Sequence, residues 1–337
     1  MTNITMTELK NKIAIIILVW NDYTNTCATI KSVLKSKGVD YDIIVVDNAS
    51  TDSCIDKIKL EFSKVVNIRY LINDENWGYA EGNNIAIRYC LNEGYEYFFI
   101  LNNDVVFDSE SCIHDMWEAM AEDKSIGIIA PVIWNKKGNG SFAKGSIMTQ
   151  SFLYRLMMRL NGIKIGEYTE GLYHVPTVSG SFMALSKNNI LKNGGFEKNF
   201  FMYAEEDDLC IRTNMSGLKV VKLTKDYGIK HLGGILNYLM AADWKRVIAC
   251  RNRVMITRTF PILQKILYCA LMFAHNFSMS ISLALNGKLM SAYLLQPAFI
   301  EGVWDMMHFK HLSKRDTLFR RGQNLAKAHK IYGIKVR

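Results

Sequence analysis

Short apolar runs alternate with longer amphipathic segments along the first 130 residues of the chain. Runs of four to seven mostly apolar residues, many of them β-branched or aromatic, have the length and content of buried strands; they lie at 13–19, 43–46, 68–72, 97–101 and 126–132. The intervening segments are predicted helices; they lie at 24–36, from about 53, from the loop at 76–84 through 91, and at 111–121. Strand–helix–strand units of this kind are right-handed and build a parallel sheet with helices on its faces. The pattern therefore predicts an α/β fold.

Polar residues follow two of these runs directly. The run at 97–101 stops at Asn102, Asn103 and Asp104, and the run at 43–46 stops at Asp47. Open α/β sheets bind ligands at the carboxyl ends of their strands, where Asp47 could accept a hydrogen bond from a ribose hydroxyl or a base. The plainer explanation is that Asn and Asp are common turn residues. Both explanations stay open on these residues alone.

The whole chain allows one large core, or a domain with an appendage. It has 337 residues, of which 49% are hydrophobic and 22% charged, so wholesale disorder is excluded. Its seven cysteines are scattered without a Cys-x-x-Cys pair, which indicates a reducing compartment rather than a disulfide framework or zinc cluster. The apolar run at 13–20 lacks a small-residue cleavage site after it and is interpreted as a first strand rather than a signal peptide.

The net charge of +9 is concentrated at one end. Residues 310–337 hold nine Lys or Arg and one Asp, a net +8 that leaves about +1 for the rest. A local basic tail indicates an anionic partner surface; nucleic acid is disfavoured because no nucleic-acid-binding module accompanies the tail. The 22 residues 266–287 carry no formal charge. They could cross a membrane, lie on its surface or pack on the catalytic domain, and the basic tail favours the membrane surface.

Two nucleotide-binding motifs are absent. No G-x-G-x-x-G and no G-x-x-x-x-G-K-[ST] follows the first strand, where the turn instead begins Trp20-Asn21. This disfavours dinucleotide dehydrogenases, and it disfavours a sugar-nucleotidyltransferase, which would need a glycine- and basic-rich phosphate loop there. Without such a cradle, a bound diphosphate would need a divalent cation held by a carboxylate.

Four consecutive acids, residues 205–208, begin a predicted helix after an apolar run. The helix dipole favours negative charge at this end, so a solvated first turn is one explanation. The other is a general base, since like charges packed closely make one carboxylate easier to protonate. The residues alone leave both alternatives open.

Three motifs together resemble a known family. VVDNASTD at 45–52, N-x-GYA-x-GNN at 76–84 and LNNDV at 101–105 are similar to the inverting family 2 glycosyltransferases, particularly the bacterial rhamnosyltransferase-like branch, over residues 12–255. The resemblance implies the GT-A fold, a nucleotide-diphosphosugar donor and Mg²⁺ or Mn²⁺. It implies donor contacts from Trp20, Asn21, Asp47, Asn76, Gly78, Asn83, Asn102 and Asn103.

The resemblance also assigns chemistry. Asp104 would be the remaining carboxylate of a D-x-D metal site, with Asn102 in place of the first, and His231 would complete that site. The family's Glu-Asp-Val-Asp-Leu motif corresponds to 205–209, so its catalytic base falls on Glu206, with Glu205 the alternative. The acceptor side would include Gly180, Ser181, Asp208 and Arg251, the last as a contact for acceptor phosphate.

The sequence thus predicts a Rossmann-like GT-A domain over 1–255 and a helical, basic region over 256–337. The nucleotide-sugar half would cover about 12–132 and the acceptor half about 133–255. The expected enzyme moves a sugar from dTDP-rhamnose or a UDP-sugar to a glycan linked to polyprenyl diphosphate, as a cytoplasmic protein on the inner face of a bacterial membrane. The alternatives are a sugar-nucleotidyltransferase and a non-catalytic nucleotide- or glycan-binding protein. The oligomeric state stays open, with a homodimer as one option.

Overall fold

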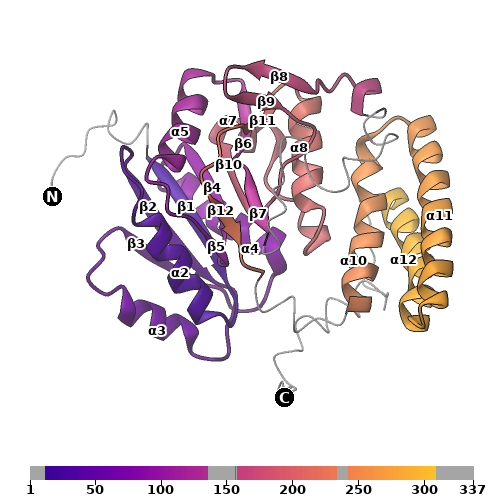
Figure 1. Ribbon diagram of the computed structural model, residues 1–337, viewed down its shortest axis with the longest axis horizontal. Helices are drawn as coiled ribbons and strands as arrows, with labels where there is room; N and C mark the ends of the chain where they lie inside the picture. The colour runs from indigo at the N-terminus through magenta and orange to yellow at the C-terminus, as the bar shows by residue number, and fades with distance from the viewer. Residues whose placement is uncertain (1–11, 136–155, 157, 234–241, 309–337) are drawn as a thin grey trace. The chain divides into compact units, whose positions relative to one another are not determined.

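The computed structural model describes residues 12–135, 156, 158–233 and 242–308 (Figure 1). The chain forms two compact units. The first comprises residues up to 198 together with 206–235, and the second comprises 199–205 together with the residues from 236 onward. The predicted boundary at 255 differs from this division by one helix, α10 (Ala242–Met255), which packs against α12 (Leu289–Met307) in the second unit.

The first unit is built on a mostly parallel sheet. In the described part of the chain its strand order is β3-β2-β1-β4-β10-β6-β11-β9-β8. The strands are β1 (Ile13–Val19), β2 (Tyr41–Asp47), β3 (Ile68–Ile72), β4 (Tyr97–Asn102), β6 (Ile126–Ala130), β8 (Gly166–Thr169), β9 (Leu172–His174), β10 (Phe182–Ser186) and β11 (Lys219–Leu223). Strands β1 to β4 are parallel, whereas β10 runs antiparallel between β4 and β6. The α/β class predicted from the sequence is confirmed.

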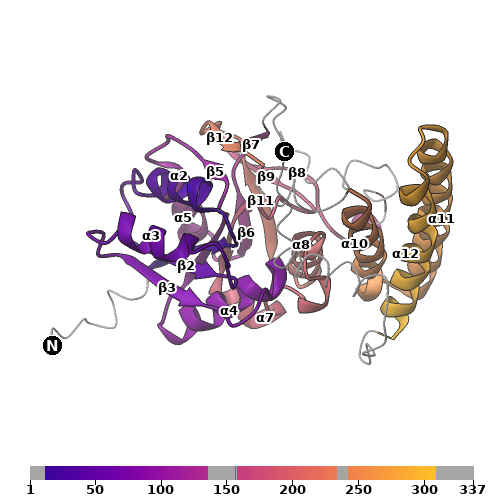
Figure 2. The same cartoon turned by 90° about the horizontal axis from the view of Figure 1, so that it is seen from below.

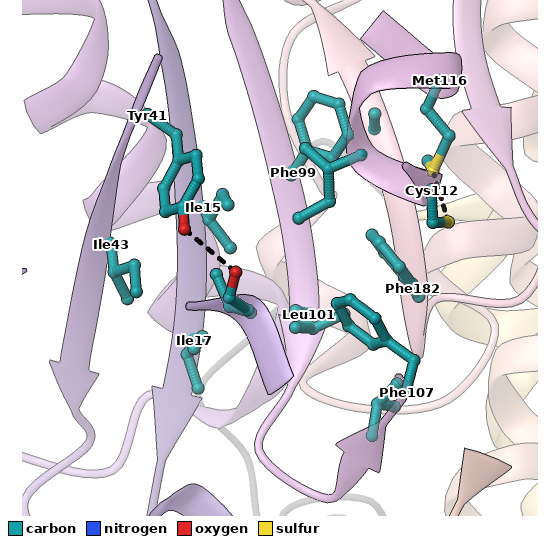
Figure 3. Packing of buried hydrophobic residues seen from close by; sticks show 14 of the residues in the cluster. Ile15, Ile17, Tyr41, Ile43, Phe99, Leu101, Phe107, Cys112, Met116 and Phe182 are labelled. Atoms are coloured by element: carbon teal, nitrogen blue, oxygen red, sulfur yellow. Dashed lines mark hydrogen bonds between the residues drawn. The ribbon is translucent and has the colours of Figure 1, made fainter. Parts of the chain in front are cut away.

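Helices cover both faces of this sheet because successive strand side chains point to opposite sides. Odd-numbered residues of β1 pack with α2 (Tyr23–Val33), α3 (Cys54–Glu61) and α5 (Cys112–Glu122). Figure 3 shows this cluster, in which the Tyr41 hydroxyl donates to the Val33 carbonyl at 3.0 Å. Even-numbered residues pack with α4 (Gly78–Asn92), α7 (Lys187–Asn193) and α8 (Glu205–Met215).

A small second sheet joins segments far apart in the sequence. Its order is β5-β12-β7, with β5 (Val105–Val106), β12 (Ile229–His231) and β7 (Ile133–Asn135). The region 135–175 was predicted to be a variable loop or helical insertion; its described part includes the β8–β9 hairpin, and residues 136–155 lie outside the description. The seven cysteines are free thiols, in agreement with the absence of a disulfide framework from the sequence pattern.

The second unit is helical (Figure 2). Helix α10, the short η3 (Ile256–Thr259), α11 (Ile262–Leu285) and α12 surround a core that includes Val247, Val254, Leu295 and Phe299. By length and composition α11 is the one helix in the described residues that could cross a membrane, and only 11% of its apolar window is buried. The basic tail at 310–337 lies outside the described residues.

Candidate functional site

The order β3-β2-β1-β4 places a topological switch point beside β1. The chain adds β2 and β3 on one side of β1 and then returns to add β4 on the other. In open α/β sheets ligands bind outside the carboxyl ends of strands at such a point. Trp20, Asp47 and Asn102 stand at the ends of β1, β2 and β4, so the predicted donor residues of these three loops meet at one edge of the sheet.

The loops after β1 and β2 are hydrogen-bonded to each other. Asn21 adopts a left-handed φ of +53°. Its backbone N–H donates to the Ser50 hydroxyl at 3.0 Å, and its side-chain oxygen accepts from the Thr51 N–H at 2.7 Å. Asp47 is buried and accepts from the Ser50 N–H at 3.0 Å, which fixes its carboxylate at the end of β2. Trp20 is buried at the start of the first loop.

Asn48 organises the asparagine-rich loop at the start of α4, a role that the sequence did not single out. Its amide nitrogen donates to Asn76 Oδ1 at 2.8 Å and to the Gly78 carbonyl at 3.1 Å. Its oxygen accepts from Asn73 Nδ2 at 3.0 Å and from the Trp77 N–H at 3.1 Å. All these bonds use one buried amide, so Asn48 sets the loop's shape. The one available signal was its place directly after Asp47.

The first turns of α4 are tied to two segments of the predicted acceptor half. The Tyr79 hydroxyl donates to the Gly180 carbonyl at 2.6 Å. The Asn84 amide accepts from the Phe196 N–H at 2.9 Å and donates to the Phe196 carbonyl at 2.7 Å. Asn83 is fully buried, and its amide donates within the helix to the Tyr79 carbonyl at 2.8 Å. Asn83, predicted as a donor contact, thus sits inside the helix packing rather than on its surface.

Asp104 and His231 come together through the small sheet. His231 of β12 is paired with Val105 of β5, and the Leu232 N–H donates to the Asp104 carbonyl at 2.8 Å. This pairing leaves His231 Nε2 at 3.1 Å from Asp104 Oδ1. The Asp104 side chain is 6% exposed and that of His231 is 33% exposed. The two predicted metal ligands, 127 positions apart in the sequence (231 − 104), therefore share one place in the fold.

Glu206 lies against the same edge through Gly180. A methyl group added at Gly180 would stand 3.3 Å from Glu206 Cβ and 3.6 Å from its carboxyl carbon. The next residue, Ser181, accepts the Asn102 N–H at 2.9 Å, and Phe182 pairs with Leu101 across the antiparallel β4–β10 ladder. Gly180 and Ser181 thus connect Glu206 with the strand end that leads to Asp104.

The four acids of α8 differ in their exposure. Glu205 is 5% exposed, Asp207 3% and Asp208 1%, whereas Glu206 is partly exposed. Asp208 forms an i,i+4 ion pair of 2.9 Å with Arg212, whose guanidinium also donates to the Gly195 carbonyl at 2.8 Å. Asp208, predicted on the acceptor side, therefore anchors α8 to the preceding loop.

Lys222 is buried in the first unit, and Arg212 is partly buried there. Burial lowers the pKa of Arg212 to about 10 and that of Lys222 to about 8. Lys222 of β11 lies two residues after Val220, which packs with Leu209 and Cys210 of α8, so its side chain points to the sheet face that α8 covers. Each cation thus lies on or beneath the helix that begins with the acids.

Arg251 is buried in the second unit. It is 1% exposed, and its guanidinium binds Asp305 of α12 at 2.8 Å and the Asn199 carbonyl at 2.7 Å. These are the contacts of a residue that holds protein segments together. These contacts argue against the prediction that Arg251 meets acceptor phosphate, because its hydrogen-bonding groups face the protein interior.

Comparisons with known proteins show which family the chain is similar to. The sequence profile described as "Glycosyl transferase family 2" matches residues 14–191. Low-salt glycan biosynthesis hexosyltransferase Agl10 of Haloferax volcanii is 28% identical over 180 residues, 53% of this chain and 55% of that protein, so the chain spans about half of its length. Rhamnosyltransferase WbbL of Escherichia coli is 26% identical over 206 residues, 57% of this chain and 74% of WbbL.

Solved structures show the same fold. The mannosyltransferase PcManGT of Pyrobaculum calidifontis, in complex with GDP-Man and Mn²⁺, has a TM-score of 0.56 at 15% identity and covers 88% of each chain. S. aureus TarS in complex with UDP-GlcNAc has a TM-score of 0.58 at 14% identity and covers 88% of this chain and 81% of TarS. The predicted GT-A architecture is confirmed. Because the family profile spans more than half of the 337 residues, the chain belongs to glycosyl transferase family 2.

Proposed function

We propose that this protein is an inverting glycosyltransferase that moves a sugar from a nucleotide-diphosphosugar to a hydroxyl group of a glycan. The observation that carries the proposal is the position of Glu206, the partly exposed acid of its cluster, against Gly180 beside the strand end that bears Asp104. Membership of the family favours sugar transfer over the nucleotidyltransferase alternative. A non-catalytic binding protein is the outcome that the experiment below tests against.

Glu206 would act as the general base. Its carboxylate would take the proton of the acceptor hydroxyl, whose oxygen forms a bond to the anomeric carbon while the bond from that carbon to the diphosphate breaks on the opposite face. Attack opposite the leaving group inverts the anomeric centre. Exposure favours Glu206 over Glu205, which is 5% exposed, because a base must reach a substrate.

Asp104 and His231 fit a divalent cation. Two ligands that bind one ion at about 2.1 Å and at a right angle lie about 3 Å apart, close to the 3.1 Å between Asp104 Oδ1 and His231 Nε2. No cluster of three or more His, Cys, Asp or Glu side chains suited to a metal occurs in the described residues, so diphosphate oxygens and water would complete the coordination. A bound Mn²⁺ or Mg²⁺ would supply positive charge for the departing diphosphate. PcManGT is solved with Mn²⁺, which supports this assignment.

The nucleotide would lie on the loops after β1, β2 and β4. Asn21, Asp47 and Asn102 stand there, and the buried amide of Asn48 holds the loop that contains Asn76 and Gly78 in place. TarS and PcManGT are solved with UDP-GlcNAc and GDP-Man, and WbbL is named a rhamnosyltransferase. These names support a nucleotide-diphosphosugar donor, with dTDP-rhamnose or a UDP-sugar as the first donors to test.

The acceptor would be a lipid-linked glycan, reached from the membrane surface through α11. Apolar side chains exposed on this helix include Ile262, Leu263, Ile266, Leu267, Leu271, Phe273, Phe277, Ile281 and Leu285. The helix carries no acidic residue, and the chain ends in a segment of net charge +8. An apolar helix face and a positively charged segment in the same chain suit an anionic lipid surface.

Replacement of the proposed base tests the enzymatic function. Glu206→Gln should lower transfer by about 10²–10⁴-fold, because an amide cannot take the acceptor proton. Nucleotide binding with Mn²⁺, measured by calorimetry, should persist. The matched control is Glu93→Gln on the exposed end of α4, which should leave transfer unchanged. The donor is identified first, by incubating the protein with a panel of nucleotide-diphosphosugars and measuring nucleotide release. An equal loss of nucleotide binding in Glu206→Gln, or full transfer by that variant, would contradict the proposed role.

Vesicle flotation tests the membrane surface. The protein should float with phosphatidylglycerol-containing vesicles and much less with phosphatidylcholine alone. Phe277→Glu, which places a charge on the exposed face of α11, should reduce the bound fraction by roughly tenfold. Ile72→Glu, at an equally exposed position of β3, is the control and should float normally. Equal flotation of both variants, or a concentration-dependent dimer that Phe277→Glu abolishes without any vesicle binding, would contradict a lipid partner.

A further inference from the structure

The segment that leads into α8 has an unusual backbone. Phe201, Tyr203 and Ala204 have φ angles of +61°, +69° and +69°. Residues with a Cβ rarely occupy this left-handed region, because the side chain crowds the following carbonyl. Such a conformation persists only when its surroundings fix it. The acids of α8 follow directly, so the direction in which Glu206 leaves the loop depends on what holds these residues.

Asn252 of α10 supplies that support. It is fully buried, and its amide nitrogen lies 2.9 Å from the Phe200 carbonyl and 2.8 Å from the carbonyls of Met202 and Tyr203. Three carbonyls thus share the two N–H groups of one side chain. These carbonyls lie within or directly beside the stretch of left-handed residues, and that of Phe200 also accepts from the Met202 N–H at 2.7 Å. Asn252 and this loop belong to the same compact unit.

Arg251 fixes the orientation of the Asn252 amide. One guanidinium nitrogen, Nη1, donates to Asn252 Oδ1 at 2.8 Å and to the Asn199 carbonyl at 2.7 Å. Because the amide oxygen faces Arg251, the amide nitrogen must face the loop. Asp305 of α12 holds the guanidinium in turn, with Arg251 Nε at 2.8 Å from Asp305 Oδ2. The Arg251 and Arg258 side chains both reach this segment, the latter lying over the Phe200 ring at 5.6 Å.

We infer that Arg251 and Asn252 are positioning residues for catalysis: through the buried chain Asp305–Arg251–Asn252 they hold the left-handed loop at 200–204 and thereby aim Glu206. This inference rests on the proposed role of Glu206 as the base. It replaces the prediction that Arg251 contacts acceptor phosphate.

Asn252→Ala tests the inference. We expect kcat to fall by about 10–100-fold, since a displacement of about 1 Å in a reacting group can cost this much, while the Kd for nucleotide with Mn²⁺ changes by less than about threefold. The matched control is Asn276→Ala. Asn276 is also a buried asparagine of the second unit, but its amide donates to Cys250 Sγ at 3.1 Å and not to the loop. A loss of kcat in Asn276→Ala as large as in Asn252→Ala would overturn the inference.

A double-mutant cycle separates positioning from general loss of structure. In a Glu206→Gln background, Asn252→Ala should lower the residual transfer by less than about twofold, because the group that it positions is already gone. A further tenfold loss in that background would overturn the inference. If Glu206→Gln itself keeps full activity, the proposed base is wrong. If Glu206→Gln is inactive and Asn252→Ala is normal, the positioning inference alone fails.

Arg251→Lys keeps the inference testable if Asn252→Ala does not fold. Lysine keeps the charge facing Asp305 but lacks the planar fork that reaches Asn252 Oδ1, Asn199 and Asp305 together. We expect a folded protein with a kcat lowered by roughly threefold to tenfold and unchanged nucleotide affinity. An unchanged kcat in Arg251→Lys would contradict the inference.

Discussion

The two proposed catalytic carboxylates are held in different ways. Asp104 stands between two strands, β4 and β5, with its carbonyl bonded to the Leu232 N–H at 2.8 Å and the partner strand of β5 delivering His231. Glu206 stands in the first turn of a helix, after a loop whose left-handed residues, including Ala204, depend on one side-chain amide. One carboxylate is placed by repeated ladder bonds and the other by a few specific contacts.

Because of this difference, substitutions near the two carboxylates should have different effects. A strand ladder has many equivalent hydrogen bonds, so a side chain at its end can change while the backbone stays in place. A left-handed loop has no such redundancy, so its geometry changes when one supporting group is removed. Substitutions at the Asp104 end should therefore affect chemistry with little effect on folding, whereas substitutions around the Glu206 loop should affect both.

A large effect on catalysis is expected on the strand-held side. Asp104→Asn should lower kcat by about 10²–10³-fold and raise the Mn²⁺ concentration needed for half-maximal rate, because the amide is a poorer ligand for a hard cation. The urea midpoint should be nearly unchanged, since the ladder around residue 104 remains. Asp108→Asn is the control, because this side chain is 94% exposed in an ion pair with Lys35. A normal Mn²⁺ dependence in Asp104→Asn would remove Asp104 from the metal site.

A smaller effect, an increase in stability, is expected from a substitution in the left-handed loop. Ala204→Gly should raise the free energy of unfolding by about 0.5–1 kcal/mol, because glycine accepts a φ of +69° without the Cβ clash. Urea denaturation provides the measurement. Ala274→Gly, at an exposed interior position of α11, should instead lower stability by about 1 kcal/mol. If both variants are destabilised to the same degree, the loop is not strained and the contrast between the two carboxylates is lost.

Local pattern predicted much of the first unit. The bounds of β1 and β3 agree residue for residue with the apolar runs at 13–19 and 68–72, because period and composition act locally. The reversal of β10 between β4 and β6 was not predicted, since its partners are set by tertiary pairing rather than by its own residues. The compact units divide near 235 rather than at 255, because α10 packs on α12 and the residues near 255 give no local signal of that packing.

Candidate site residues could be proposed from the sequence where the residue type and its position in the chain were sufficient. They could not be proposed where the role of a side chain depends on its partner in the folded protein. Asp104 stands at a strand end that any parallel sheet would use, and Glu206 lies in a conspicuous run of acids. Arg251 shows the limit: a sequence cannot tell a buried guanidinium from an exposed one, and its partner Asp305 is 54 residues away. The ion pair between Asp208 and Arg212 was not predicted either, although its i,i+4 spacing is a recognised ion-pair pattern.

The hydrogen bonds between the start of α4 and its neighbours limit how α4 can move. The Tyr79 hydroxyl is hydrogen-bonded to the Gly180 carbonyl, and the Asn84 amide is hydrogen-bonded to both the N–H and the carbonyl of Phe196. Because the start of α4 is hydrogen-bonded at these points, a movement of α4 that makes room for a nucleotide would also move Gly180, against which Glu206 packs. On the proposed function, binding of the sugar donor would therefore be coupled to the position of Glu206.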